Sequence, residues 1–533
     1  MHDDARSNLA IAQTAAREGA AISNYCEVIS LLHEKGADGV EGTKVIGALV
    51  KNKVGDASFE VYAKSILFAG GPFTDEMRKM EDKNSKEAVT GAAGIHIVLP
   101  RYYNSTGIGL VDMNTSDGRF LFFLPWQDHV LVGTTDSKCV PTMRPEPDER
   151  EIKWLLNEAS KYLSRDVPLR RKDVLSEWSG IRPLAVDPNA DPNNTAGLSR
   201  DHVVSYNPSS GSVFVSGGKW TTYREMAEDA VSKVVEVTPD LSKATESKTL
   251  ETSLVGLAGY HRHQQIHLIQ EFGVSSKVAQ RLVRAYGGRA RDVLNIAVEM
   301  EKEYLGKLHV HARGGGESEV DAALHSSRTF VEDNREFYKE NMLISGHPYL
   351  EAEVIFAVRH DWCVRATDFI ARRTRLAFLD KYKAIQAVPK VVSLMAKELN
   401  WTPARQEEEV VYCIDYLRYF GGPHVIASPT GEENVRLATL EDMKDVFGKV
   451  DSNATGGITR DEVFLVSEML SHRLTPEELD DCMKHASQIV HGRQEVAFND
   501  FAIWWNSDRF NEGLKELKAV KGEAVAGEGQ LFG

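Results

Sequence analysis

The sequence predicts an α/β (α+β) domain, an all-helical domain and a C-terminal pair of helix–loop–helix units, in that order along 533 residues. Apolar strand-like runs that alternate with helices predict the first domain over residues 1–240. Apolar residues at helical spacing predict the second domain over residues 250–420. An oxygen-rich loop between two amphipathic stretches predicts the third part over residues 436–508.

The composition excludes several classes of protein. An apolar content of 42% and a charged content of 26% are typical of globular domains. The net charge of −15 argues against a nucleic-acid partner, because phosphate binding needs a basic surface. The five cysteines are odd in number and form no CxxC pattern, so they favour free thiols in a reducing compartment. No apolar run approaches the roughly 18 residues of a membrane span, which leaves contact with a membrane surface open.

The elements of the first domain follow from local periodicity. A helix begins almost at once, with Leu9, Ala12 and Ala16 on one face and Gly19 at its end. The run over residues 65–69 is continuously apolar, which is typical of a strand covered on both faces. Further strands are expected at residues 27–32, 44–50, 59–63, 94–99, 120–124, 130–133, 202–206 and 212–215.

The second domain is predicted to be helical over residues 276–286, 350–359 and 366–379. Three consecutive glycines predict a flexible loop over residues 311–327. A Gly-Gly-Pro sequence opens a linker over residues 421–434.

The segment that follows the strand at 212–215 predicts a ligand site. Gly217 and Gly218 let the backbone approach a ligand, and Lys219 adds a positive charge. Thr221 and Thr222 stand at a helix N-terminus, where unpaired N–H groups point outward. The segment therefore suits an electron-rich ring or an anion, and an ordinary strand-to-helix turn with a solvent-exposed lysine is the alternative.

Two arginines and a histidine are further candidates in this domain. Arg182 stands in a turn bounded by glycine and proline, and Arg200 immediately precedes the strand at 202–206. Together with Lys219 they could hold a phosphate through charge-assisted hydrogen bonds, whereas surface salt bridges are the alternative. His96 alternates with apolar residues, as either a catalytic base or a packed histidine would.

The loop over residues 451–462 fits a calcium-binding EF-hand. Asp451, Asn453 and Thr455 supply side-chain oxygens at the first, third and fifth positions. The carbonyl of Gly457 follows, and Glu462 closes the site with two oxygens. Threonine at the fifth position leaves two charged ligands, so micromolar or weaker binding is expected.

EF-hands pair, and a partner is expected in the sequence that follows. Helices are predicted at residues 476–485 and 498–505. The loop between them, residues 487–499, lacks acidic residues at its early positions. It is expected to pair with the first loop without binding metal.

Several segments in order resemble the FAD-dependent glycerol-3-phosphate dehydrogenase family. They are GGPFTD at 70–75, GIHIVLP at 94–100, FFLPW at 122–126, GTTD at 133–136, WSGIRPL at 178–184, SRDH at 199–202 and GGKWTTYR at 217–224. Residues 349–354 and 371–379 resemble that family's helical C-terminal domain. The trailing EF-hands resemble its mitochondrial, calcium-responsive branch.

The resemblance implies a reaction and a location. The substrate would be sn-glycerol 3-phosphate, whose C2 hydride passes to FAD while a base removes the hydroxyl proton, and the product would be dihydroxyacetone phosphate. Electrons would pass to ubiquinone, with the protein bound peripherally at the mitochondrial inner membrane. Calcium would modulate the activity, and the resemblance also allows a homodimer.

The resemblance also assigns site residues. His96 or Lys219 would act as the base, Arg182 would lie beside flavin and substrate, and Arg200 would bind the substrate phosphate. The residues expected around the flavin are Gly70, Gly71, Gly217, Gly218, Trp220, Thr221 and Thr222.

One departure concerns the front of the sequence. The family opens with a βαβ unit whose GxGxxG motif holds the FAD pyrophosphate, and no such motif follows a strand here. We therefore expect a chain that lacks this first unit, is N-terminally incomplete, and as written binds FAD poorly with little activity. The alternatives are a glycerol-3-phosphate oxidase that uses oxygen and a non-catalytic calcium-binding fragment.

Overall fold

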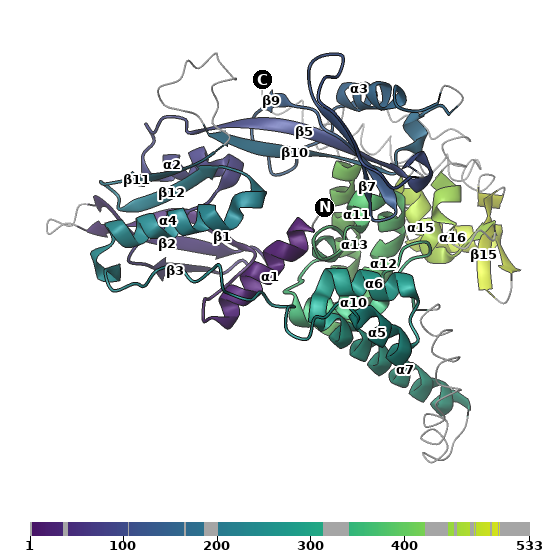
Figure 1. Cartoon of the computed structure of the whole chain (residues 1–533). Helices are drawn as coiled ribbons and strands as arrows, with labels where there is room; N and C mark the ends of the chain where they lie inside the picture. Colours follow the sequence, from purple (N-terminus) through teal and green to yellow (C-terminus); the bar gives the residue numbers. More distant parts are fainter. Residues whose placement is uncertain are drawn as a thin grey trace, which may run out of the picture.

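The computed structural model separates a sheet-rich part from a helical part, with α1 (Asp4–Arg17) between them (Figure 1). It describes residues 3–35, 41–104, 106–164, 167–185, 201–312, 341–421, 446–451, 456–469, 474, 476–490, 493–498, 500 and 501. Asp3 caps α1 by accepting a hydrogen bond from the Arg6 N–H. Within these ranges, no helix combines the length and the apolar character needed to cross a bilayer.

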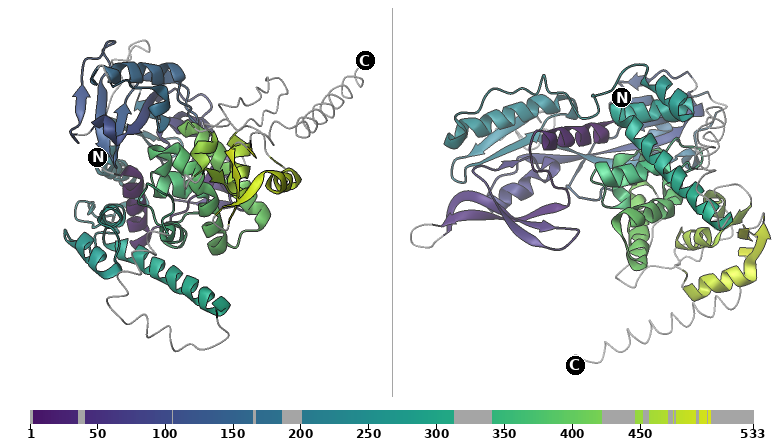
Figure 2. Two further views of the ribbon diagram at one scale, coloured as in Figure 1. Left: turned by 90° about the vertical axis from the view of Figure 1, so that its right-hand side faces the viewer. Right: turned by 90° about the horizontal axis from the view of Figure 1, so that it is seen from below.

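A three-layer unit forms one end of the molecule. Its central sheet has the strand order β11 (His202–Asn207), β12 (Ser212–Gly217), β4 (Leu67–Phe68), with β12 and β4 parallel. Helix α4 (Tyr223–Val237) packs on this sheet. The antiparallel sheet β1 (Cys26–Lys35), β2 (Glu41–Asn52), β3 (Ser58–Tyr62) covers the other face, as the right-hand view of Figure 2 shows. Leu31, Val45, Phe68 and Phe214 form the core between the two sheets.

A six-stranded antiparallel sheet forms the second unit and carries most of the candidate site. Its order is β10 (Ser176–Ala185), β5 (Val89–Pro100), β8 (His129–Gly133), β7 (Leu121–Trp126), β6 (Leu110–Asp112), and β9 (Ser137–Cys139) also pairs with β5. Helix α3 (Glu149–Ser160) covers one face with Ile152 and Leu155. Short helices η1 (Gly71–Phe73) and α2 (Thr74–Glu81) link this sheet to β4.

The helical domain is built on two adjoining cores. The first contains α5 (Gln264–Phe272), α6 (Ser276–Tyr286), α7 (Ala290–Ala312) and α10 (Glu351–His360). The second contains α11 (Leu376–Leu379), α12 (Lys381–Leu399) and α13 (Pro403–Leu417). The Asp380 carboxylate caps α12 by accepting from two backbone N–H groups, and Asn400 ends it in the left-handed conformation.

The C-terminal unit shares the second of these cores. Helices α15 (Arg460–Met469) and α16 (Pro476–Ala486) accompany a small sheet of β13 (Gly457–Ile458), β15 (Arg493–Ala497) and β14 (Ser487–Val490). Phe447, Val450 and Ile458 are buried in the same cluster as residues of α12 and α13. The C-terminal unit is therefore packed onto the helical domain, as Figure 1 shows.

Two expected elements differ from the structure. The apolar run at 65–69 is a strand only at Leu67–Phe68, because it pairs with β12 only opposite Val213 and Phe214. The helix expected at 366–379 is a π-helical turn, Asp368–Arg373, followed by α11. Thr374 separates them, because its N–H and its hydroxyl both donate to the Phe369 carbonyl at 2.8 Å.

The loop expected at 311–327 begins inside α7 and otherwise lies outside the described residues, as does the linker beyond Gly421.

Candidate active site

His96 lies on β5 inside an aromatic setting that fixes its ring. The strand register places Trp178 of β10 directly opposite, and the two rings stack with centroids 5.4 Å apart. Phe122 of β7 lies 5.5 Å away. Gly133 of β8 is also opposite His96, and a Cβ there would come within 2.5 Å of the imidazole Cδ2. The ring therefore fits only because position 133 has no side chain.

The imidazole of His96 is neutral and has an unused nitrogen. Its Nδ1 is buried and has no hydrogen-bond partner of good geometry among the described residues, although the Gly94 backbone is near enough to favour the protonated ring slightly. Burial and the positive charge of Arg182 lower the pKa of His96 to about 4. A neutral imidazole with an unsatisfied nitrogen can accept or donate a hydrogen bond to a bound molecule. An orphaned buried polar atom of this kind is rare in folded proteins and favours a functional role.

Arg182 of β10 extends over β5, close to the position of His96. Its guanidinium lies over Gly94, where a Cβ would be only 2.3 Å from Nη1. It donates to Thr134 Oγ1 at 2.7 Å and to the Thr135 carbonyl at 3.2 Å, and Asp136 Oδ1 is 3.5 Å away. The side chain keeps 36% of its surface exposed. Arg182 is thus fixed in direction while part of its charge remains available.

Thr134 and Thr135 orient Arg182, a role that the sequence analysis did not assign to them. Residue types alone carried no signal for this, because threonines are common beside strands. The signal lies in the pairing of β5 with β8 and β9, which places the segment across β5 from β10.

The four predicted glycines cluster where β4 and β12 end. Gly71, Gly217 and Gly218 have positive φ values of 55°, 74° and 77°. A Cβ on Gly217 would meet Ala185 Cβ at 2.9 Å, and one on Gly218 would meet Met226 Sδ at 2.6 Å. A side chain at 217 or 218 would therefore meet protein atoms, and the positive φ values favour glycine at both positions. The approach of a flavin to this backbone stays a prediction.

Gly71 is the position that leaves open space, because a Cβ there would have no neighbour within 4 Å. At Gly70 the space is already occupied, because a Cβ there would lie 2.5 Å from the Sδ of Met77. Helix η1, which Gly71 opens, packs against β10, β5 and β12. The open backbone at Gly71 therefore belongs to the same region as the strands that carry His96 and Arg182.

The segment after β12 is exposed. Lys219, Trp220, Thr221 and Thr222 all present surface to solvent. Trp220 stacks on Tyr223 with centroids 5.1 Å apart. Thr222 donates through both its N–H and its hydroxyl to the Lys219 carbonyl, so its amide is not free for an anion. Arg200 lies outside the described residues.

Comparison with known families accounts for most of the chain. Residues 1–224 match the model described as FAD dependent oxidoreductase. Residues 247–406 match the model described as the C-terminal domain of alpha-glycerophosphate oxidase. Residues 1–224 therefore belong to the FAD dependent oxidoreductase family.

Individual relatives agree with this family. A protein named mitochondrial glycerol-3-phosphate dehydrogenase from Bos taurus is 38% identical over 531 residues, which are 99% of this chain and 66% of that protein. The Homo sapiens protein of the same name gives the same values. One from Arabidopsis thaliana is 39% identical over 433 residues, 78% of this chain and 61% of that protein. The chain thus spans slightly less than two thirds of the length of these relatives.

A solved structure supports the fold. The glycerol-3-phosphate dehydrogenase of Bacillus halodurans, determined with FAD, superposes with a TM-score of 0.60 at 24% identity. The match covers 81% of this chain and 75% of that one.

In the part that matches the FAD dependent oxidoreductase model, the described residues fit the ring end of a flavin. The unsatisfied Nδ1 of His96, the open backbone at Gly71 and the partly exposed guanidinium of Arg182 belong to adjoining strands and turns. Together they offer hydrogen bonds and positive charge to a planar, electron-rich ring and an anionic substrate.

A cavity of about 1010 Å³ lies beyond the aromatic rings. Trp126 lines this cavity, and its ring centroid lies 6.0 Å from that of Trp178. Because Trp178 stacks on His96, these two rings connect the cavity wall to the imidazole. Many cations line it, but Arg6 is bound to Asp361 at 2.5 Å and Arg281 is bound to Glu353. Part of this positive charge therefore holds α1 to the helical domain and joins α6 to α10 within that domain.

The C-terminal loop is described in part. Gly456, with φ of 81°, donates its N–H to Asp451 Oδ2 at 2.8 Å. Glu462 accepts from the N–H and the hydroxyl of Thr459. Ile458 pairs with Val496 in the β13–β15 ladder. Asn453 and Thr455 lie outside the described residues, and the described residues contain no group of three or more metal-ligating side chains.

Proposed function

We propose that this protein oxidises sn-glycerol 3-phosphate to dihydroxyacetone phosphate with FAD, in mitochondria. The similarity to mitochondrial glycerol-3-phosphate dehydrogenases over 99% of the chain supports the substrate and the compartment. The observation that carries the chemistry is the buried, unpartnered Nδ1 of His96 beside Arg182.

The reaction needs a hydride acceptor and a base. A bound FAD would supply the acceptor for the C2 hydrogen and its electron pair. His96, neutral because of its lowered pKa, takes the proton of the C2 hydroxyl as the carbon–oxygen double bond forms. Lys219 is the alternative base, since it is exposed at the end of β12.

The arginines stabilise negative charge in this reaction. The guanidinium of Arg182, fixed by Thr134 and Thr135, favours charge that develops on the C2 oxygen. Arg200 binds the substrate phosphate through the forked geometry that suits phosphate oxygens.

Anaerobic mixing tests the proposal. Protein loaded with FAD should lose its oxidised-flavin absorbance when glycerol 3-phosphate is added, with one dihydroxyacetone phosphate formed per flavin. Glycerol and sn-glycerol 1-phosphate serve as controls for the phosphate and for stereochemistry. Flavin that stays oxidised with glycerol 3-phosphate but is reduced by another hydroxy compound would reject this substrate.

The electron acceptor is a separate part of the proposal. We infer ubiquinone at the surface of the mitochondrial inner membrane, in line with the mitochondrial relatives. An oxygen-using oxidase is the second candidate, because the helical domain matches a model described from alpha-glycerophosphate oxidase. Turnover with a soluble ubiquinone analogue should exceed oxygen consumption, and the reverse would favour the oxidase.

We also propose that the loop 451–462 binds calcium with micromolar or weaker affinity. The turn at Gly456, the hydrogen bond from its N–H to Asp451, and the pairing of Ile458 with Val496 support an EF-hand pair. Calorimetry should detect binding that Glu462→Gln weakens strongly and that Asp461→Asn, an exposed neighbour, leaves unchanged. Absence of binding at millimolar calcium would contradict the proposal.

An effect of calcium binding on the active site would pass through the hydrophobic core that the C-terminal unit shares with the helical domain. Lys449, just before the loop, lies 3.3 Å from the hydroxyl of Tyr382 on α12. The ring centroids of Phe420 and Phe378 are 4.7 Å apart, and those of Phe378 and Trp178 are 4.9 Å apart. Trp178 in turn stacks on His96. We expect calcium to lower KM for glycerol 3-phosphate. A KM that is the same with and without calcium would contradict this coupling.

A further inference from the structure

A side chain of the helical domain touches the stacking partner of His96. Phe378 of α11 meets Trp178 of β10 edge to face, with ring centroids 4.9 Å apart and an angle of 81° between the ring planes. This is a favoured geometry for aromatic pairs. Trp178 lies nearly parallel to the imidazole of His96, at an angle of 10°. One indole thus contacts both the candidate base and a ring from another domain.

The Phe378 ring is itself held in place. Phe420, beyond α13, packs against it edge to face with centroids 4.7 Å apart. The guanidinium of Arg375 lies 5.1 Å from the Phe378 centroid. Arg375 is in turn bound to Asp3 at 3.0 Å, just before α1. Contacts from three parts of the chain therefore fix the ring that supports Trp178.

The backbone beside Trp178 is bound to the same part of the helical domain. The hydroxyl of Ser176, which is fully buried, donates to the Ala377 carbonyl at 2.8 Å. The N–H of Lys381 donates to the Leu175 carbonyl at 3.1 Å. These bonds hold the start of β10 whatever the side chain at position 378. A smaller side chain there would consequently free the indole without releasing the strand.

We propose that Phe378 is a positioning residue for His96. By holding the indole of Trp178, it keeps the imidazole in one orientation and shielded from water. A displacement of about 1 Å in a reacting group can slow a reaction about 10²-fold, so the orientation matters to the rate. The effect on the rate rests on the function proposed above, whereas the effect on the imidazole does not.

NMR titration of the His96 imidazole in the full chain tests the proposal without using the activity. In Phe378→Leu the indole can tilt, and water reaches the imidazole. Because burial is the largest cause that lowers the pKa of His96 to about 4, this pKa should rise by about one unit or more. Phe378→Tyr keeps the ring and should keep the pKa low. Arg182, the second cause, and Asp136 beside it are unchanged in both variants.

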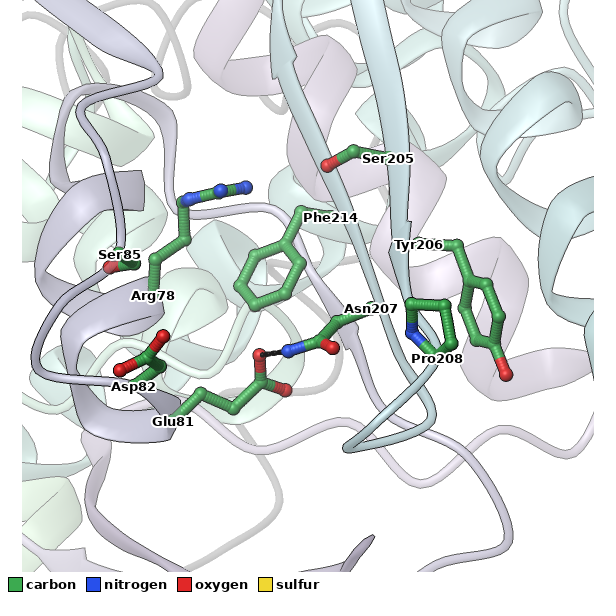
Figure 3. Close-up of a pocket in the computed structure, with 9 residues that line it drawn as sticks. All are labelled: Arg78, Glu81, Asp82, Ser85, Ser205, Tyr206, Asn207, Pro208 and Phe214. Carbon is green, nitrogen blue, oxygen red and sulfur yellow. Dashed lines mark hydrogen bonds between the residues drawn. The ribbon is translucent and has the colours of Figure 1, made fainter. Parts of the chain in front are cut away.

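Phe214→Leu is the matched control. Phe214 stacks on Phe68 with centroids 4.7 Å apart, in a different core from that of Trp178. It borders a cavity of about 240 Å³ between α2 and the β11–β12 hairpin (Figure 3). This variant removes a comparable aromatic pair and should leave the pKa of His96 at about 4. An equal rise in Phe214→Leu and Phe378→Leu would reflect a general loss of packing and would overturn the proposal.

Flavin reduction by glycerol 3-phosphate gives a second measurement. Phe378→Leu should lower the rate constant at saturating substrate about 10–100-fold and leave KM within about twofold, because the change displaces the base and removes no substrate contact. Phe378→Tyr should restore the rate. Either an unchanged pKa or an unchanged rate constant in Phe378→Leu would overturn the proposal.

Two further outcomes are distinguishable. If the unaltered protein does not reduce its flavin with this substrate, the proposed function fails, while the titration still decides the role of Phe378. If Phe378→Leu does not fold, Trp178→Phe replaces it, because the smaller ring cannot fill the space between Phe378 and His96. The pKa of His96 should rise in that variant as well, and an unchanged pKa would overturn the proposal.

Discussion

At the scale of single residues, His96 acquires its chemistry from neighbours on three strands. Trp178 and Phe122 enclose the ring, Gly133 leaves room for it, and Arg182 opposes its protonation. None of these four is adjacent to it in the sequence. The result is an imidazole that stays neutral at physiological pH and has an unsatisfied nitrogen.

Replacing His96 by glutamine should slow flavin reduction by roughly 10²–10⁴-fold, the usual contribution of a positioned base. His261→Gln, at an exposed histidine of the helical domain, should leave the rate unchanged. Rapid mixing under anaerobic conditions measures both.

The pH dependence tests His96 as the base. Because the pKa of His96 is lowered to about 4, a His96 mechanism predicts a rate that is level above about pH 5 and falls as the imidazole becomes protonated near pH 4. A rate that still changes with pH well above 5 would contradict His96 as the base.

Arg182→Gln tests the electrostatic link. Removing the positive charge should raise the pKa of His96 toward the ordinary value, although burial, the larger cause, would keep it lowered. NMR titration of the imidazole measures the shift. Arg101→Gln, a distant arginine that pairs with Asp128, is the control, and an unchanged pKa in Arg182→Gln would show that the charge has no influence.

At the scale of elements, the site depends on the register of β5 with both of its neighbours. Trp178 and Gly133 are opposite the same residue, His96, from β10 and β8 respectively. A shift of one position would turn these residues to the other face of the sheet. The pairing of strands distant in sequence is therefore what assembles the imidazole pocket.

Gly133→Ala tests this requirement. The new Cβ would come within 2.5 Å of His96 Cδ2, so the ring must move and flavin reduction should slow markedly. Gly180→Ala on β10 is the matched control, because a Cβ there has no neighbour within 4 Å. Comparable rates in the two variants would mean that the orientation of His96 does not limit the reaction.

At the scale of the whole molecule, buried charge joins the sheet-rich part to the helical domain. Lys381 at the start of α12 and Glu177 on β10 lie 3.4 Å apart, and each side chain is only 4% exposed. Arg171 binds the same carboxylate at 2.5 Å. Glu177 precedes Trp178, so this contact also holds the strand that supports His96.

Lys381→Met should therefore reduce the free energy of unfolding by about 3 kcal/mol, because Glu177 would be left buried with Arg171 as its remaining cation. Lys233→Met, which breaks a pair on the surface of α4, should change it by about 0.5 kcal/mol or less. Denaturant titration compares the two, and equal effects would mean that the buried pair adds no stability.

Local pattern was sufficient to predict much of the fold. Apolar periodicity located α1, α6 and most strands, because helices and strands differ in repeat at short range. It failed at the segment 366–379, where Thr374 ends one helical turn through hydrogen bonds that no periodicity reveals. It also overextended the strand at 65–69, because strand length depends on where the partner strand pairs.

The sequence by itself determined the candidate residue types, the order of the domains and the resemblance to one flavoprotein family. Only the tertiary structure decided that His96 and Arg182 meet, that Thr134 and Thr135 orient the arginine, and that side chains at Gly217 and Gly218 would meet protein atoms. The physical reason is that each of these features depends on contacts between strands and helices distant in the chain, whereas a sequence pattern reports only neighbours along it.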